Sequence, residues 1–127
     1  MQPLGLRTAI YPAPDLEAAK AFFRDLLGID PYFDEPFFVG FQVGGYELAL
    51  NPNADPDEGV ITYWGVPDAQ AALDELLAAG AVHHGGVDDV GEGIKVATVT
   101  IVGGGIFGVI ENPHFAVVAV PSDGPGR

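Results

Sequence analysis

The chain has 127 residues, which suits one compact domain with a core large enough to be stable without cross-links. It has no cysteine, so disulfides, thiolate zinc sites, iron–sulfur clusters and a cysteine nucleophile are excluded. Eighteen acidic residues against five basic ones give a net charge of −13, which makes nucleic acids and anionic membranes poor partners. No apolar run approaches the length of about 20 residues that crosses a bilayer, and no secretory signal is visible, so we expect a cytoplasmic protein.

The first half of the chain, about residues 4–52, predicts one strand, one helix and three more strands. After a strand at residues 4–11, Asp15 supplies a side chain that can cap a helix reaching Leu27, with Gly28 at its end. β-like runs follow at residues 31–33, 37–43 and 46–50, and a Gly-Gly turn joins the last two. The prolines, asparagines and acids of residues 51–59 are typical of an exposed loop.

The second half, about residues 59–115, predicts the same order of elements, with a helix near residues 68–79 and strands at 60–66, 81–87, 94–102 and 106–111. Pro67-Asp68 repeats Pro14-Asp15 at an offset of 53 residues, and Asn112-Pro113 repeats Asn51-Pro52 at an offset of 61. We expect the extra residues of the second copy in the acidic turn 88–93. Two βαβββ modules predict an α+β domain whose eight strands curve around a central cup, followed by a tail at 116–127.

This repeat, together with residues 13–16, 22–23 and 108–113, resembles the vicinal-oxygen-chelate superfamily. That superfamily includes glyoxalase I, extradiol dioxygenases, fosfomycin-resistance enzymes and bleomycin-binding proteins. The resemblance covers about residues 4–115 and implies a single glyoxalase-like domain. It also implies a homodimer, with the strand edges and the apolar segment 115–120 as candidate contacts.

The resemblance implies a divalent metal (Mn, Fe, Ni, Co or Zn) held by His or Glu on the first and fourth strands of each module. The corresponding positions in this chain are Thr8, Ala49, Ile61 and Gly108, none of which supplies a carboxylate or an imidazole. We therefore expect no cofactor. The alternative is a displaced metal site formed by Glu47, Glu111 and His114, because strand alternation can direct Glu47 into the cup.

Strand alternation also predicts which side chains line the cup. One face of residues 37–43, with Phe37, Val39, Phe41 and Val43, is wholly apolar and should pack under the helices. The predicted ligand-binding residues on the opposite face and on the neighbouring strands are Thr8, Ile10, Phe38, Gln42, Glu47, Tyr63, Thr98 and Thr100. Such a mixture of apolar, aromatic and hydroxyl side chains suits a small organic molecule, although the same residues can equally form a closed core or a dimer contact.

Three other motifs do not predict function. The glycines of residues 103–108 fit G-x-G-x-x-G, but a strand follows them where a nucleotide site needs a helix. Residues 53–58 resemble the start of a calcium loop, but Glu58 stands where the turn glycine belongs. The only serine, Ser122, lies in the tail, which excludes a Ser-His-Asp hydrolase, and His83 and His84 are interpreted as solvated residues.

Three functions follow from these observations. The first is a metal-free small-molecule binding protein that sequesters a cationic or aromatic compound, as the resemblance to bleomycin-resistance proteins and the net charge of −13 imply. The second is a metal-dependent lyase or dioxygenase with the displaced site, built within one chain or across a dimer interface. The third is a structural or regulatory dimer without a ligand.

Overall fold

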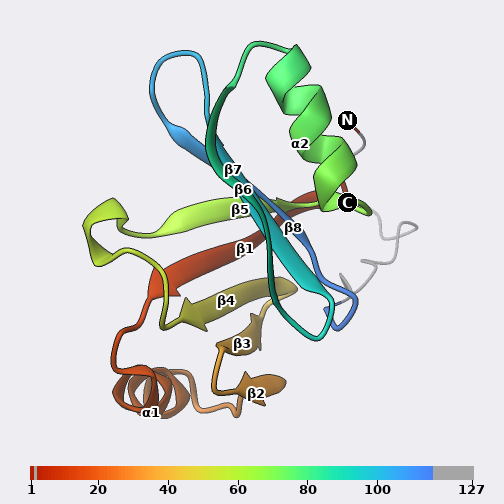
Figure 1. Cartoon of the computed structure of the whole chain (residues 1–127). Coiled ribbons are helices and arrows are strands. Elements are labelled where there is room, and N and C mark those ends of the chain that lie inside the picture. The colour runs from red at the N-terminus through yellow and green to blue at the C-terminus, as the bar shows by residue number, and fades with distance from the viewer. Residues whose placement is uncertain (2, 116–127) are drawn as a thin grey trace, which may run out of the picture.

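A computed structural model describes residue 1 and residues 3–115 of the chain (Figure 1). Its elements are β1 (Gly5–Pro12), α1 (Leu16–Leu27), β2 (Phe33–Glu35), β3 (Phe38–Val43), β4 (Tyr46–Asn51), a short 3₁₀ helix (Pro56–Glu58), β5 (Ile61–Gly65), α2 (Ala69–Ala78), β6 (Val82–Gly91), β7 (Ile94–Thr100) and β8 (Ile106–Glu111). The βαβββ order therefore occurs twice, as the sequence predicts. The tail 116–127 lies outside the described residues.

All eight strands form one curled sheet in the order β2-β3-β4-β1-β5-β8-β7-β6. The two modules join at the centre, where β1 and β5 run antiparallel with Ile10 opposite Ile61. Within each module the first strand runs parallel to the fourth, β1 beside β4 and β5 beside β8. The two modules are thus paired within one chain, and β2 and β6 form the edges of the sheet.

Local capping fixes both helices at the predicted places. The Asp15 side chain accepts a hydrogen bond from the backbone of Ala18, and Gly28 ends α1 in the left-handed conformation with a φ of 69°. The Asp68 side chain accepts in the same way from Ala71 at the start of α2. In Figure 1, α1 lies beside the β2–β4 end of the sheet and α2 beside the β6–β8 end.

The extra residues of the second module do not all lie in the acidic turn, so that part of the prediction is wrong. Two residues separate Val43 from Tyr46, which pair across the first hairpin, whereas five separate Thr100 from Ile106 in the second. β6 is also ten residues long, against three for β2. The register of β6 against β7 shifts at several points because β6 carries more residues than its partner can pair.

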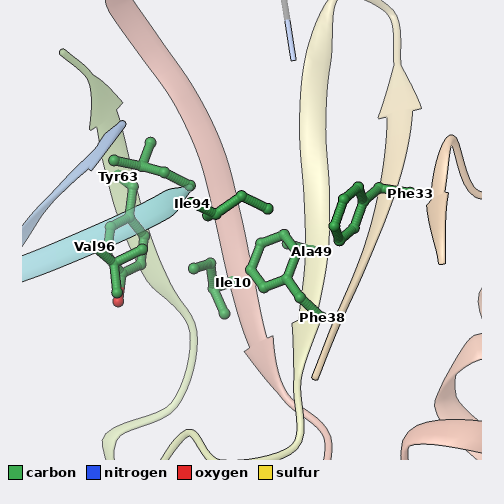
Figure 2. Close-up of a cluster of buried hydrophobic side chains, with 8 residues drawn as sticks. Ile10, Phe33, Phe38, Ala49, Tyr63, Ile94 and Val96 are labelled. Carbon is green, nitrogen blue, oxygen red and sulfur yellow. The ribbon is translucent and has the colours of Figure 1, made fainter. Parts of the chain in front are cut away.

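The concave side of the sheet is filled by a cluster that both modules share. It contains Ile10, Phe33, Phe38 and Ala49 from the first module, and Tyr63, Ile94, Val96 and Ile110 from the second. Figure 2 shows Ile94, Ile10 and Phe38 meeting between the strands of the two modules. Much of the expected cup is therefore a closed core.

Two further clusters lie under the helices on the other side. Val39 and Phe41 pack with Phe23 and Leu27 of α1, as the alternation of residues 37–43 predicts. Phe37 is an exception, because it precedes β3 and packs against the concave cluster instead. The other cluster joins α2 to β7 and β8.

Candidate functional site

A cavity of about 550 Å³ opens beside the closed core. We call it the loop pocket, because one wall is the connector between the modules, residues 51–59, and the facing wall is residues 84–88 of β6. Its floor is formed by Ile10, Ile61, Tyr63 and Val96 of the central strands. The volume lies in the range that holds small organic molecules.

The rim of the loop pocket is acidic. Asp55 and Glu58 contribute carboxylates from the connector and Asp88 contributes a third from β6, whereas no lysine or arginine is among the lining residues of the described chain. The connector is held in place by its own side chains, because Asn51 accepts from the amide of Asn53 and Asp55 accepts from the amide of Asp57. The pocket thus presents negative charge around an apolar floor.

His84 joins the two walls of the loop pocket. Its Nε2 lies 2.7 Å from Glu58 Oε2, and its Nδ1 lies 2.7 Å from Thr98 Oγ1. Thr98 is buried on β7 with an exposed fraction of 8%, whereas the side chains of His84 and Glu58 are partly exposed. One imidazole therefore connects the connector, β6 and β7.

A second polar group joins the first module to Asn112 of the second module, and we call it the Glu47 cluster. Thr8 Oγ1 donates to Glu47 Oε1 at 2.6 Å, and the Tyr32 hydroxyl donates to Glu47 Oε2 at 2.5 Å. Asn112 donates in turn to the Tyr32 hydroxyl at 3.2 Å. Gly40 makes room for this contact, since a Cβ at that position would lie 2.5 Å from Glu47 Oε2.

Burial governs the ionisation of the Glu47 cluster. Glu47 is 2% exposed, and the loss of solvation raises the pKa of its carboxyl above the ordinary value of 4.5. The hydrogen bonds from Thr8 and Tyr32 and the charge of Arg7 act in the opposite direction and offset part of that effect. Burial and the neighbouring Glu47 raise the pKa of Tyr32, which keeps its hydroxyl protonated and able to donate.

The positions of the superfamily's metal ligands do not fit a divalent cation in this chain. Register pairing places Thr8 opposite Glu47 and Ile10 opposite Ala49, so Glu47 is the carboxylate beside the first strand. Both oxygens of Glu47 are bonded to side chains, and Thr8, Ile61 and Gly108 add no carboxylate, imidazole or thiolate.

Within one chain the structure does not bring Glu47, Glu111 and His114 together, so a displaced metal site that uses a second chain stays a prediction. The side chain of Glu111 accepts a hydrogen bond from the Ala69 amide at the start of α2, on the opposite side of the sheet from Glu47. The imidazole of His114 lies 2.8 Å from the carbonyl oxygen of Glu92. Among the described residues, no group of three or more His, Cys, Asp or Glu side chains has the arrangement of a metal site.

The structure separates the eight predicted ligand-binding residues into several environments. Ile10, Tyr63 and Thr98 line the loop pocket. Thr8 and Glu47 belong to the Glu47 cluster, and Phe38 is fully buried in the concave core. Gln42 is exposed and Thr100 is half-buried, and neither lines the loop pocket. That these residues bind a ligand stays a prediction.

Sequence reasoning missed the connector and β6 as sources of the site. The sequence predicts a solvated loop at Asp55 and Glu58 and a solvated position for His84. The available signal was the antiparallel pairing of residues 81–87 with 94–102, which brings His84 close to Thr98. No local pattern predicts that the connector folds back over the floor of the pocket.

The family model of the Glyoxalase/Bleomycin resistance protein/Dioxygenase superfamily matches residues 5–118. The chain therefore belongs to this superfamily, whose fold it shares. None of the curated proteins matches the chain significantly. No helix in the described part of the chain is both long and apolar enough to span a membrane.

Solved structures share the fold at low sequence identity. A methylmalonyl-CoA epimerase variant from Streptomyces coelicolor, in complex with 2-nitronate-propionyl-CoA, has a TM-score of 0.66 at 14% identity and covers 94% of this chain and 100% of its own. Methylmalonyl-CoA epimerase from Mycobacterium tuberculosis has a TM-score of 0.62 at 17% identity, with coverage of 86% and 88%. A superfamily member from Vibrio splendidus 12B01 has a TM-score of 0.52 at 20% identity, with coverage of 84% and 97%.

Proposed function

We propose that this protein binds a small cationic organic molecule in the loop pocket, without a metal ion. The observation that carries this proposal is the combination of three rim carboxylates with an apolar floor in one cavity of about 550 Å³. A ligand with an aromatic or aliphatic body and a positively charged group matches both parts.

The apolar floor supports binding of the ligand's body. Ile10, Ile61 and Val96 offer aliphatic surface, and the Tyr63 ring adds an aromatic face that can contact a cation or a flat ring. Burial and the nearby Glu58 raise the pKa of Tyr63 to about 12, so its hydroxyl stays neutral at physiological pH. The floor of the loop pocket therefore carries no charged group.

The charge of the rim and of the whole molecule supports the choice of a cation. Asp55, Glu58 and Asp88 surround the opening, and the chain carries a net charge of −13. Negative potential concentrates cations near the pocket and disfavours anions such as carboxylates and phosphates.

Isothermal titration calorimetry with benzyltrimethylammonium, benzyl alcohol and benzoate tests this proposal. We expect binding heat for the cation, weaker binding of the neutral alcohol and none for benzoate. Asp55→Asn and Asp88→Asn should each weaken the cation by up to about fivefold, because a partly exposed ion pair contributes about 0.2–1 kcal/mol. Asp25→Asn makes the same charge change on α1, away from the pocket, and should leave the affinity unchanged. Equal affinity for cation and anion would contradict the proposal.

We also infer that the protein is a homodimer. The support is apolar surface on α1, where Phe22 and Leu26 are 60% and 64% exposed. Light scattering on the calorimetry samples should give twice the chain mass, and a monomer at those concentrations would refute the inference. Of the apolar segment 115–120, only Phe115 is described, and it is buried.

A further inference from the structure

A glutamate, a histidine and a threonine lie in one line of short contacts on the walls of the loop pocket. Glu58 Oε2 and His84 Nε2 are 2.7 Å apart, and His84 Nδ1 and Thr98 Oγ1 are also 2.7 Å apart. We propose that Thr98 is a nucleophile, His84 its general base and Glu58 a positioning residue, and that this group cleaves esters by acyl transfer. This activity goes beyond binding and uses the same cavity.

The contacts of His84 define which nitrogen carries the proton. An ionised carboxylate can only accept hydrogen bonds, so Glu58 selects the tautomer with the proton on Nε2. In that tautomer Nδ1 has a free lone pair, and the Thr98 hydroxyl, whose oxygen lies 2.7 Å away, is the donor. The hydroxyl proton of Thr98 therefore already points at a base, which is the arrangement that activates a hydroxyl nucleophile.

The same contacts select Thr98 rather than His84 as the atom that attacks a ligand. Both ring nitrogens are engaged by protein side chains, so neither is available to a ligand while these contacts persist. Thr98 lines the loop pocket, and its hydroxyl oxygen keeps a second lone pair. A threonine thus takes the role of nucleophile in the described part of the chain, which contains no serine.

The surroundings of Thr98 leave room for a substrate and provide a donor. A Cβ on Gly85, the register partner of Thr98, would lie 2.8 Å from Thr98 Oγ1, so glycine keeps that side of the hydroxyl open. Tyr63 lines the same pocket with a protonated hydroxyl. A phenol that stays neutral can donate to an oxygen that becomes negatively charged in the tetrahedral intermediate.

The reaction uses only the ester, water and these residues. Thr98 Oγ1 bonds to the acyl carbon and gives its proton to His84 Nδ1. The bond from the acyl carbon to the ester oxygen then breaks, and the departing alcohol takes the proton from Nδ1. Water next attacks the acyl-threonine and passes a proton to Nδ1. Thr98 Oγ1 leaves the acyl carbon and recovers that proton, so ester and water become acid and alcohol. Nε2 keeps its proton on Glu58 throughout.

The test is hydrolysis of p-nitrophenyl acetate by the full-length protein, followed by release of p-nitrophenol and by peptide mass spectrometry. We expect turnover above the buffer rate and one acetyl group on the peptide that contains Thr98. Thr98→Val should lower kcat/KM by at least about 100-fold, and His84→Gln should do the same. Thr98→Ser keeps a hydroxyl and should retain activity, which separates loss of the nucleophile from loss of folding.

Two further variants sharpen the test. His83→Gln removes the neighbouring imidazole, which does not line the loop pocket, and should leave turnover unchanged. Glu58→Gln should lower kcat for p-nitrophenyl acetate with little change in KM, because this ester carries no positive charge for the rim carboxylates to bind and Glu58 then acts only by positioning His84.

Each outcome decides between the proposals. Equal turnover in the native protein and in Thr98→Val, or an acetyl group on another residue, overturns the acyl-transfer inference, whatever calorimetry shows. An acetylated Thr98 without cation binding overturns the proposed binding function alone. Cation binding without acetylation leaves the binding function and removes the catalytic one.

Discussion

Glu47 is a buried acidic residue in the region where the superfamily resemblance places metal ligands. It is the carboxylate opposite Thr8, yet both of its oxygens are used by Thr8 and Tyr32 rather than left open. Sequence patterns alone assign Ala49 to the ligand position on this strand, because a strand without its pairing partner has no fixed register. Alternation predicts that Glu47 points to the concave side, and its side chain is 2% exposed in the structure.

Replacing Glu47 should change how stability depends on pH. Because the pKa of Glu47 is raised in the folded state, the folded protein binds this proton more tightly than the unfolded chain does. The stability that Glu47 contributes is fully present below the unfolded value of 4.5 and is lost as the pH rises through the higher folded value. Urea unfolding from pH 4 to pH 8 should therefore show the native protein losing stability relative to Glu47→Gln. A difference that stays constant across this range would contradict the assignment.

At the scale of elements, the helices were easier to predict than the strands. Asp15 and Gly28 determine the ends of α1 through local contacts, and Asp68 does the same at the start of α2. The ends of strands depend on partners far away in the sequence, so β6 extends to Gly91 through the turn expected at residues 88–93. The face of β3 is predicted correctly because the alternation of side chains is a local property of the strand. Phe37 lies before the start of β3, so the alternation does not determine its direction.

Helix α2 should depend on Glu111 as well as on its own cap. Glu111 accepts from the amide of Ala69 in the first turn, where backbone donors have no partner within the helix and negative charge is favourable. Glu111→Ala should lower the free energy of unfolding by about 1 kcal/mol, and Glu111→Gln by less because its amide oxygen still accepts. Urea denaturation measures both. Equal losses for the two variants would show that the hydrogen bond is not the stabilising contact.

At the scale of the molecule, the two modules should unfold together. The central β1–β5 pairing and the shared concave cluster connect them, and Phe38 of the first module lies in that cluster with Ile94 of the second. The repeat in the sequence predicts two similar modules, but it does not predict that they share one core, because no pattern within either copy specifies the contacts between them.

Phe38→Ala should therefore lower the unfolding midpoint of both modules by the same amount. Removing a fully buried phenylalanine costs about 3–5 kcal/mol. The single tryptophan, Trp64, lies in the second module and stacks on Phe107, so its fluorescence reports that module, while far-UV circular dichroism reports the whole chain. Tyr46→Ala, at an exposed position of the first module, should change the midpoint little. An unchanged fluorescence midpoint in Phe38→Ala would mean that the modules unfold separately.

The connector of residues 51–59 has a consequence for how such a protein can diversify. When a chain is built from two copies of one unit, each strand and helix has a counterpart, but the segment between the copies is present once. In this protein that unpaired segment supplies Asp55 and Glu58 to the rim of the pocket, whereas the sheet beneath supplies the floor. If the loop pocket binds the proposed ligand, changes in the connector can alter which ligand it accepts while the two-module scaffold stays the same. In this protein, the part of the pocket that has no counterpart in the other module comes from the segment that joins the two modules.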